Sequence, residues 1–337
     1  IWNHNLQAVE FLWNDRSPQG LSLIHYGDWC DLIDKAGHQG KGVSIWMSFA
    51  LSKVLQTVQK IALARGEKQV AATCKKRNTI LTKAIKKHGW DNDHFLYAIS
   101  DNGTRVGASK AKEGKYFINP QSWAMLTGAV DPEAYTRITE KYEPKVDTPV
   151  GPITCWPAFT KYDPNIGQLT GTPSGFFTNG NVYCHAASFK VAADFEAGRN
   201  EKAFDTFMKI LPAEDRSEPY AQANGYVGPT AMRMRRHVSD DPWRTGTVAW
   251  NFLNCIDRLL GFRREIDGVR IDPRIPAKWK QATFTRPFRG TLFEIEIQRG
   301  PSASLTLDGE TLPDNFIPVG PQGLGKKSVK VLCIIEK

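Results

Sequence analysis

The sequence predicts a mainly helical protein that ends in a small antiparallel β domain. Apolar residues recur at helical spacing through most of residues 1–262, whereas residues 263–337 form short alternating segments broken by Gly, Pro and Asp-Gly turns. We therefore expect a helical domain over residues 1–262 and a β domain over residues 263–337.

The expected elements follow in chain order. The first residues, IWNHNLQAVEFLWNDR, are amphipathic, and the run from Val43 to Ala64 has the apolar spacing of a helix. Further helices fit residues 67–89, 121–128, 132–142, 183–196, 201–210 and 247–260. Strands fit the segments DGVRIDPRIP, ATFTRPFRGTLFEIEIQRG, ASLTLDG and KSVKVLCIIE.

Two long segments between the helices are rich in glycine, proline and aromatic residues. They run from Gly151 to Gly180 and from Ser217 to Trp243. Loops of this length exceed what a compact domain needs as connectors, and they often carry function. We expect both to line a site.

Composition narrows the class of protein. The 337 residues are 41% hydrophobic and contain neither an apolar run of membrane-spanning length nor a signal-peptide pattern. The six cysteines lie far apart without CxxC pairs, which favours buried reduced thiols in a cytoplasmic protein. Because Ile1 stands inside an amphipathic pattern, we expect the chain to be a piece of a longer protein.

The net charge of +9 favours anionic partners. Basic residues are spread among acidic ones and form no tail or repeated basic-aromatic module, so a small anionic substrate explains the charge as well as nucleic acid does. We expect neither a nucleic-acid partner nor a membrane partner.

An acidic stretch near the start, HYGDWCDLIDKAGHQGKG, places Asp28, Asp31 and Asp34 around Trp29. Asp34 fits a helix-capping role ahead of the helix that starts near Gly42. For the other two acids, Trp29 and the nearby Tyr26 would desolvate a neighbouring carboxyl group and raise its pKa toward the range of a general acid. A tryptophan beside an acid can also hold a sugar ring on its apolar face.

Two further clusters carry polar groups at expected helix starts. In TNGNVYCHAASF, His185 opens a helix but lacks partners at the spacing that a metal site would need. In DDPWRTGTVAW, Thr245, Gly246 and Thr247 offer hydroxyls and backbone N–H groups that could bind an anion, although a simple threonine cap explains them equally well.

Taken together, the sequence resembles the inverting disaccharide phosphorylases of glycoside hydrolase family 94, the cellobiose and chitobiose phosphorylase group. The matching stretches occur in the family's order: GDWCDLIDKAGHQGKGVSIWMS, INPQSWAMLTG, KYDPNIGQLTG, NGNVYCHAASF, RSEPY, WRTGTVAW and LLGFRREIDGVRIDPRIPAKW. The resemblance implies the later part of an (α/α)6 barrel followed by the family's small C-terminal β-sandwich. It also implies a homodimer, a missing N-terminal segment of the same enzyme, and no cofactor or metal, inorganic phosphate being a co-substrate.

The resemblance also implies roles for individual residues. Asp31 corresponds to the general acid, and Trp29 to the tryptophan that lines the donor-sugar site. The phosphate-binding positions fall on His185, Thr245 and Gly246, and an arginine that completes them would precede this chain.

Asp28 and Glu218 are expected to bind or orient the sugar. In the implied reaction phosphate attacks the anomeric carbon of a β-glucosidic disaccharide while Asp31 protonates the leaving oxygen, giving α-glucose 1-phosphate. An inverting hydrolase would need a second carboxylate to deprotonate water, whereas phosphate is already an anionic nucleophile.

Departures from the family pattern bear on the acceptor sugar. Phe177-Thr178 stands where cellobiose phosphorylases have Lys-Glu, Cys30 replaces an asparagine, and Val43 replaces a glutamate. With the arginines of 233–236, these changes favour an acidic acceptor of the cellobionic acid type, although those arginines also fit a solvated surface run. Cellobiose, laminaribiose, chitobiose and β-glucan acceptors stay open, as do an inverting β-glycoside hydrolase and a non-catalytic sugar-binding fragment.

Overall fold

The computed structural model describes residues 1–212, 221–231 and 246–336. The chain divides into two compact units. The first comprises Ile1–Gly198 and Thr206–Thr247, and the second comprises Arg199–Asp205 and Val248–Lys337. The division between a helical domain and a β domain at residues 262 and 263 stays a prediction.

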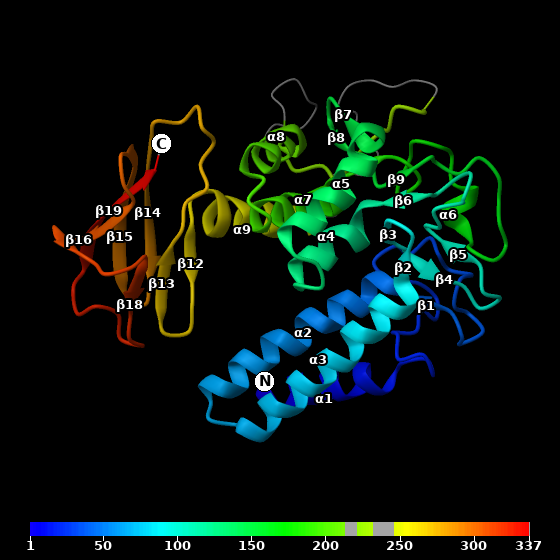
Figure 1. Ribbon diagram of the computed structural model, residues 1–337, viewed down its shortest axis with the longest axis horizontal. Helices are drawn as coiled ribbons and strands as arrows, with labels where there is room; N and C mark the ends of the chain where they lie inside the picture. Colours follow the sequence, from blue (N-terminus) through cyan, green and yellow to red (C-terminus); the bar gives the residue numbers. More distant parts are fainter. Residues whose placement is uncertain (213–220, 232–245, 337) are drawn as a thin grey trace. The chain divides into compact units, whose positions relative to one another are not determined.

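The first unit is built from helices joined by loops that contain very short strands (Figure 1). Its helices are α1 (Trp2–Asn14), α2 (Ile45–Ala64), α3 (Lys68–Gly89), α4 (Ile118–Leu126), α5 (Pro132–Val146), α6 (Gln168–Gly171) and α7 (Cys184–Glu196). Helix α8 (Asn200–Ile210) has residues in both units. The strands are β1 (Val43–Ser44), β2 (Trp90–Asp91), β3 (His94–Phe95), β4 (Ala98–Ile99), β5 (Arg105–Val106), β6 (Tyr116–Phe117), β7 (Asp147–Thr148), β8 (Gly151–Pro152), β9 (Cys155–Trp156), β10 (Val182–Tyr183) and β11 (Gly225–Tyr226).

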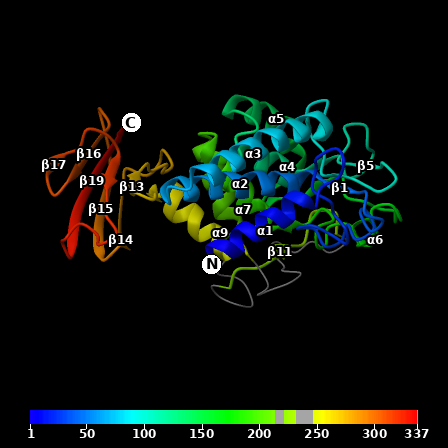
Figure 2. The same cartoon turned by 90° about the horizontal axis from the view of Figure 1, so that it is seen from below.

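Helices α2 and α3 form an antiparallel hairpin, and they lie side by side in both views (Figures 1 and 2). Phe49, Leu55, Leu81 and Ile85 are fully buried in the core that the hairpin shares with α1. The spacing that predicted the α2 helix therefore corresponds to its buried face. The amphipathic N-terminal segment is α1, as predicted.

Helices α2, α4 and α7 each begin directly after a two-residue strand: β1 leads into α2, β6 into α4 and β10 into α7. Helix α4 contacts both α2 and α7. Trp123 of α4 connects the three helices, since it has ring contacts with Trp46 of α2 at 5.6 Å and Phe189 of α7 at 5.4 Å. The helix pairs agree with a helical domain, while closure into an (α/α)6 barrel stays a prediction.

Several expected helices differ from the structure at their ends. Helix α4 begins at Ile118 rather than at residue 121, because Pro120 falls in the first turn, where a missing N–H costs nothing. Helix α5 runs beyond residue 142 to Val146. The helix expected over residues 247–260 is α9 (Thr247–Leu253) followed by the π-helical turn η1 (Asn254–Leu259).

The second unit contains two sheets. Strands β12 (Phe262–Arg264), β13 (Gly268–Ile271) and β18 (Phe316–Pro318) form one, and β14 (Gln281–Phe288), β15 (Thr291–Gly300), β19 (Ser328–Glu336), β16 (Ser304–Leu307) and β17 (Glu310–Thr311) form the other. Phe262 of the first sheet packs edge-on against Phe284, Phe288 and Phe293 of the second, at 5.5–6.5 Å between ring centroids. The four predicted strand segments are therefore confirmed, and their buried alternate residues explain the sequence pattern.

The expectation of a purely antiparallel β domain is wrong in one place. Strand β19 pairs with β15 in parallel register, from Leu292 opposite Ser328 to Gly300 opposite Glu336. The chain leaves this sheet after β17, forms β18 in the other sheet, and returns between β15 and β16. Local alternation of apolar residues cannot report this crossover, because it is the same for both strand directions.

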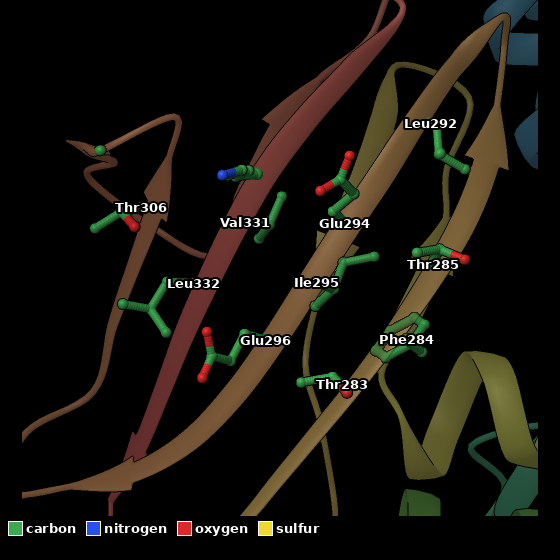
Figure 3. A pocket seen from close by; sticks show the side chains of 12 residues that line it. Thr283, Phe284, Thr285, Leu292, Glu294, Ile295, Glu296, Thr306, Val331 and Leu332 are labelled. Atoms are coloured by element: carbon green, nitrogen blue, oxygen red, sulfur yellow. The ribbon is translucent and has the colours of Figure 1, made fainter.

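A cavity of about 670 Å³ lies over the five-stranded sheet (Figure 3). Glu294 and Glu296 project into it from β15, two residues apart and therefore on one face. None of the residues singled out in the sequence lines this cavity.

No helix in the described part of the chain combines the length and apolarity needed to cross a bilayer. Five of the six cysteines are buried, as expected, and Cys255 is partly exposed.

Candidate active site

The acidic stretch forms a series of tight turns between α1 and α2 (Figure 1). Gly27 lies near its start with a φ of +150°, and a Cβ atom there would lie 3.3 Å from the Asp31 Cα. The carboxylate of Asp31 is exposed, and among the described residues it has no hydrogen-bond or ion-pair partner. An unpaired acid at the surface of an otherwise well-anchored turn is available to a ligand.

Asp28 has the opposite environment. Its Oδ1 accepts hydrogen bonds from the Cys30 backbone N–H at 2.7 Å and from the Tyr97 hydroxyl at 2.9 Å, and its Oδ2 accepts one from the Ser44 hydroxyl at 2.5 Å. Burial raises the pKa of Asp28 to about 6, against the effect of these three donors, and the charge of Asp31 adds to the rise.

The predicted pKa rise on this turn is therefore confirmed for Asp28, but Tyr26 does not cause it. Tyr26 is 78% exposed and cannot desolvate a carboxyl group. Tyr97, which is 1% exposed, lies against Asp28 instead.

Trp29 connects the acidic turn to α7. Its indole Nε1–H donates a hydrogen bond to Nδ1 of His185 at 3.1 Å. The indole ring also meets Tyr183 edge-on at 4.9 Å, Phe189 at 6.0 Å and Trp46 at 6.4 Å. These contacts place the expected sugar-binding tryptophan and the expected phosphate-binding histidine side by side.

His185 lies in the first turn of α7, after β10. Its ring packs 4.6 Å from that of Phe189, and burial lowers the pKa of His185 to about 4. Gly246 lies against the same imidazole, since a Cβ atom at position 246 would come within 2.8 Å of His185 Cε1 and 3.0 Å of Nε2. Two of the three expected phosphate-binding residues are thus adjacent in space.

Cys30 and Thr178, two of the departures from the family pattern, touch each other. The Cys30 Sγ lies 3.2 Å from the Thr178 Oγ1, and both side chains are buried. Burial raises the pKa of Cys30 to about 12, so the thiol is neutral. Phe177, beside Thr178, is 47% exposed and has a φ of +47°.

Asp34 binds a backbone N–H at a helix start, as expected, but the helix is α6 and not α2. Ser44, not Asp34, caps α2, since its hydroxyl accepts from the Met47 N–H at 2.9 Å. Asp34 instead accepts from the Gln168 N–H at 2.9 Å, at the start of α6. The nearby backbone pair Leu169 N–H to Leu32 O, at 2.7 Å, joins the same two segments. Part of the long segment 151–180 is therefore docked beside the acidic turn.

Some expected residues lie outside the described part of the chain. These are Thr245, Glu218 and the arginines of 233–236. The expected roles of these residues, and of Asp31, Trp29, His185, Gly246 and Asp28, stay proposals.

Sequence reasoning missed Ser44 and Tyr97 as anchors of Asp28. Ser44 carried a usable signal, because a serine just before an apolar helical run is a common N-cap. Tyr97 lies 69 positions from Asp28 and carried no local signal.

The geometry supports acid chemistry on the acidic turn beside a neutral imidazole. No group of three or more His, Cys, Asp or Glu side chains within the described ranges could hold a metal ion.

Comparisons with known proteins agree with these motifs. The chain is 35% identical to a solabiose phosphorylase of Paenibacillus borealis, over 96% of this chain and 44% of that protein. It is 31% identical to a cellobionic acid phosphorylase of Neurospora crassa, over 91% of this chain and 40% of that protein. A 3-O-beta-D-glucopyranosyl-beta-D-glucuronide phosphorylase of Paenibacillus borealis is 32% identical, over 92% of this chain and 42% of that protein. The chain thus spans less than half the length of these relatives.

Similar solved structures share the fold alone. A sialidase matches with a TM-score of 0.59 at 13% identity, over 84% of this chain and 26% of that chain. A GH78 family rhamnosidase of Bacillus sp. GL1 matches with a TM-score of 0.51 at 19% identity, over 89% of this chain and 29% of that chain.

The family model of the glycosyl hydrolase 94 superfamily catalytic domain matches residues 1–261. The acidic turn, the His185 segment and Gly246 all lie within this match. The chain belongs to the glycosyl hydrolase 94 superfamily.

Proposed function

We propose that the protein containing this chain is an inverting disaccharide phosphorylase. It cleaves a β-glucosidic disaccharide with inorganic phosphate and releases α-glucose 1-phosphate and the acceptor sugar. The observation that carries the proposal is the hydrogen bond between Trp29 and His185, because it joins the segment of the candidate acid to the segment of the candidate phosphate site.

Asp31 is the proposed general acid. Its carboxylate is exposed and lacks a partner among the described residues, so it can approach the glycosidic oxygen of a bound sugar. The three residues before Asp31 hold the turn in place. The side chains of Asp28, Trp29 and Cys30 each form a hydrogen bond with another part of the chain. Such positioning favours proton transfer, which requires the acid within hydrogen-bond reach of the leaving oxygen.

His185 and Gly246 are proposed to bind phosphate, together with Thr245. A neutral imidazole presents one N–H donor, and the glycine lets the backbone at position 246 lie directly beside that ring. Phosphate held here attacks the anomeric carbon, and Asp31 transfers its proton to the leaving oxygen. The C–O bond to the acceptor breaks as the C–O bond to phosphate forms.

An inverting hydrolase is the competing proposal. It would need a second carboxylate about 6.5–9.5 Å from the acid, with a water molecule between them. Asp28 and Asp34 are equally near to Asp31 in sequence, and both carboxylates already accept hydrogen bonds from other groups. The phosphorylase proposal needs no such base, because phosphate is its own nucleophile.

For the acceptor we propose an acidic sugar such as gluconate. Two relatives are named for acidic saccharides, cellobionic acid and a glucopyranosyl-glucuronide. In this chain Thr178 stands where cellobiose phosphorylases have a glutamate, and it is buried against Cys30. A neutral residue at this position avoids repulsion of a carboxylate, and the net charge of +9 favours anions. Chitobiose, laminaribiose, solabiose and neutral cellobiose are the alternatives.

The test is phosphorolysis by the full-length protein. Cellobionic acid, cellobiose and solabiose are incubated with and without inorganic phosphate, and the products are identified by the anomeric signals of glucose and glucose 1-phosphate. The proposal expects α-glucose 1-phosphate and no reaction without phosphate. Release of free glucose in the absence of phosphate would establish the hydrolase instead.

An acceptor screen in the synthetic direction tests the acidic substrate. With α-glucose 1-phosphate as donor, gluconate or glucuronate should be used more efficiently than glucose or N-acetylglucosamine. We also propose that the protein acts in the cytoplasm as a homodimer, which fractionation and light scattering of the full-length protein test.

A further inference from the structure

We propose that Trp29 is a positioning residue that holds His185 as a hydrogen-bond donor at Nε2. This inference rests on the proposed function in one respect only, namely that the Nε2–H group faces phosphate. The position of the proton itself follows from the contact between the two side chains.

The direction of the contact is fixed by chemistry. An indole nitrogen can donate a hydrogen bond and cannot accept one, so the 3.1 Å contact from Trp29 Nε1 requires a lone pair on His185 Nδ1. A proton on Nδ1 would oppose the indole N–H. In a neutral imidazole the proton must then reside on Nε2.

The surroundings of His185 keep the imidazole neutral. The ring packs against Phe189 at 4.6 Å and Trp29 at 5.9 Å between centroids, and burial lowers the pKa of His185 to about 4. Near neutral pH the ring therefore has one proton and one lone pair, and Trp29 assigns the lone pair to Nδ1.

The Trp29 ring is itself held in place. Tyr183 meets it edge-on at 4.9 Å with an interplanar angle of 69°, and Phe189 meets it edge-on at 6.0 Å. A tilted contact with Trp46 at 6.4 Å adds a third aromatic neighbour. The indole N–H therefore has a fixed direction, which selects one tautomer and also one of the two flipped orientations of the imidazole ring.

Gly246 adjoins the Cε1–Nε2 edge of the imidazole. A Cβ atom there would lie 2.8 Å from Cε1 and 3.0 Å from Nε2, so only a residue without a side chain lets the backbone lie this close to the ring. An N–H group at Nε2 attracts a phosphate oxygen, whereas a lone pair at Nε2 would repel it. The proton of a neutral histidine can reside on either ring nitrogen, and Trp29 thereby makes Nε2 of His185 a hydrogen-bond donor for an anion.

The test compares W29F and W29L with W46F in the full-length protein. W29F keeps an aromatic ring but removes the N–H donor, whereas W29L removes both. W46F is the matched control, because it removes an indole N–H of the same aromatic cluster that has no hydrogen-bond partner among the described residues. Losing one neutral hydrogen bond is expected to raise the KM for phosphate about three- to tenfold in W29F.

Kinetic parameters separate this role from sugar stacking. W29F should raise the KM for phosphate more than the KM for the disaccharide, since a phenyl ring still offers an apolar face, while W29L should raise both KM values. An unchanged phosphate KM in W29F, or an equal rise in W46F, would overturn the inference.

A spectroscopic measurement tests the proton position without relying on activity. In protein labelled with ¹⁵N-histidine, the two ring nitrogens of His185 have distinct shifts according to which one is protonated, and H185Q identifies the signal. We expect Nε2–H with an unprotonated Nδ1 in wild type and W46F, and a mixture of tautomers or exchange broadening in W29F. A proton on Nδ1 in the wild type refutes the inference, whether or not the protein proves to be a phosphorylase.

Discussion

Cys30 and Thr178 are 148 positions apart in the chain, and their Sγ and Oγ1 atoms lie 3.2 Å apart. Cys30 stands where the resembled family usually has an asparagine, and Thr178 stands where cellobiose phosphorylases have a glutamate. Because the two positions touch, they form one structural unit, and a change at one constrains the other.

The first prediction concerns this pair. T178E places an acid in a site that is 6% exposed and should lower the free energy of unfolding by about 2–4 kcal/mol. C30N supplies an amide donor, so the double variant should recover about 1 kcal/mol of that loss. Denaturant unfolding of the two single variants and the double variant measures the coupling. Strictly additive effects would contradict the contact.

The same variants address acceptor choice. If the proposed acidic acceptor is correct, the double variant should lose about tenfold in kcat/KM for gluconate relative to glucose, because a carboxylate now faces the acceptor side. Synthesis rates with α-glucose 1-phosphate as donor measure the ratio. An unchanged ratio of kcat/KM for gluconate to that for glucose would show that Thr178 does not take part in acceptor recognition. The phosphorylase proposal would still hold.

Replacing Asp31 by asparagine should abolish phosphorolysis without affecting the fold. Removing a general acid lowers kcat by about 100- to 10,000-fold. The side chain is exposed and has no partner among the described residues, so the free energy of unfolding should change by less than about 0.5 kcal/mol. D34N, on the same stretch, is the matched control and should retain activity. Wild-type turnover by D31N would remove Asp31 from the mechanism.

Asp28 should matter for stability through its three hydrogen bonds. D28A leaves the Tyr97 and Ser44 hydroxyls without their acceptor and should cost about 2–4 kcal/mol of unfolding free energy. D28N should cost less, since its Oδ1 can still accept from Cys30 and Tyr97, both of which use that atom. Urea titration ranks the variants, and equal losses in both would contradict the assigned bonds.

Replacing Gly246 by alanine tests the contact with His185. The new Cβ would come within 2.8 Å of Cε1 and must displace the ring, so the KM for phosphate should rise about tenfold or more, with a smaller effect on the disaccharide KM. G320A is the control, because a Cβ at that position would meet, among the described residues other than its chain neighbours, just one atom within 4 Å, a carbonyl oxygen at 3.9 Å. Equal behaviour of G246A and G320A would show that the imidazole does not adjoin Gly246.

The depressed pKa of His185 predicts a pH dependence of stability. Below pH 6.5 the unfolded chain takes up a proton at this residue, while the folded chain stays neutral down to about pH 4. The folded state therefore loses stability as the pH falls through this window, by up to about 3 kcal/mol. The unfolding free energy of wild type minus that of H185Q should fall from pH 6.5 to pH 4. If the difference in unfolding free energy between wild type and H185Q does not change with pH, the lowered pKa of His185 is refuted.

Much of the fold could be predicted from local patterns. Buried apolar spacing identified the helices that became α2, α3 and α7, and alternation identified β14, β15, β16 and β19. The patterns failed where neighbours in space decide the structure. The short strand β1 pairs with β4, and β10 pairs with β11, across separations that no local spacing reports.

The candidate site shows the same limit. Asp34 looked like a cap for the helix that follows it, yet it caps α6, 134 positions away. Tyr26 looked like the group that desolvates an acid because it is close in sequence, yet it is 78% exposed. Proximity along the chain was a poor guide to contact in both cases.

The sequence by itself determined the order of helices and strands, the motifs that place the chain in its family, and the residue types available for acid and anion chemistry. Only the tertiary structure decided which of the neighbouring acids on one turn is partly buried and hydrogen-bonded and which is exposed, and which nitrogen of His185 accepts a hydrogen bond from Trp29. The physical reason is that burial, pKa and tautomer depend on side chains that approach from distant parts of the chain, whereas propensity and periodicity depend on neighbours along it.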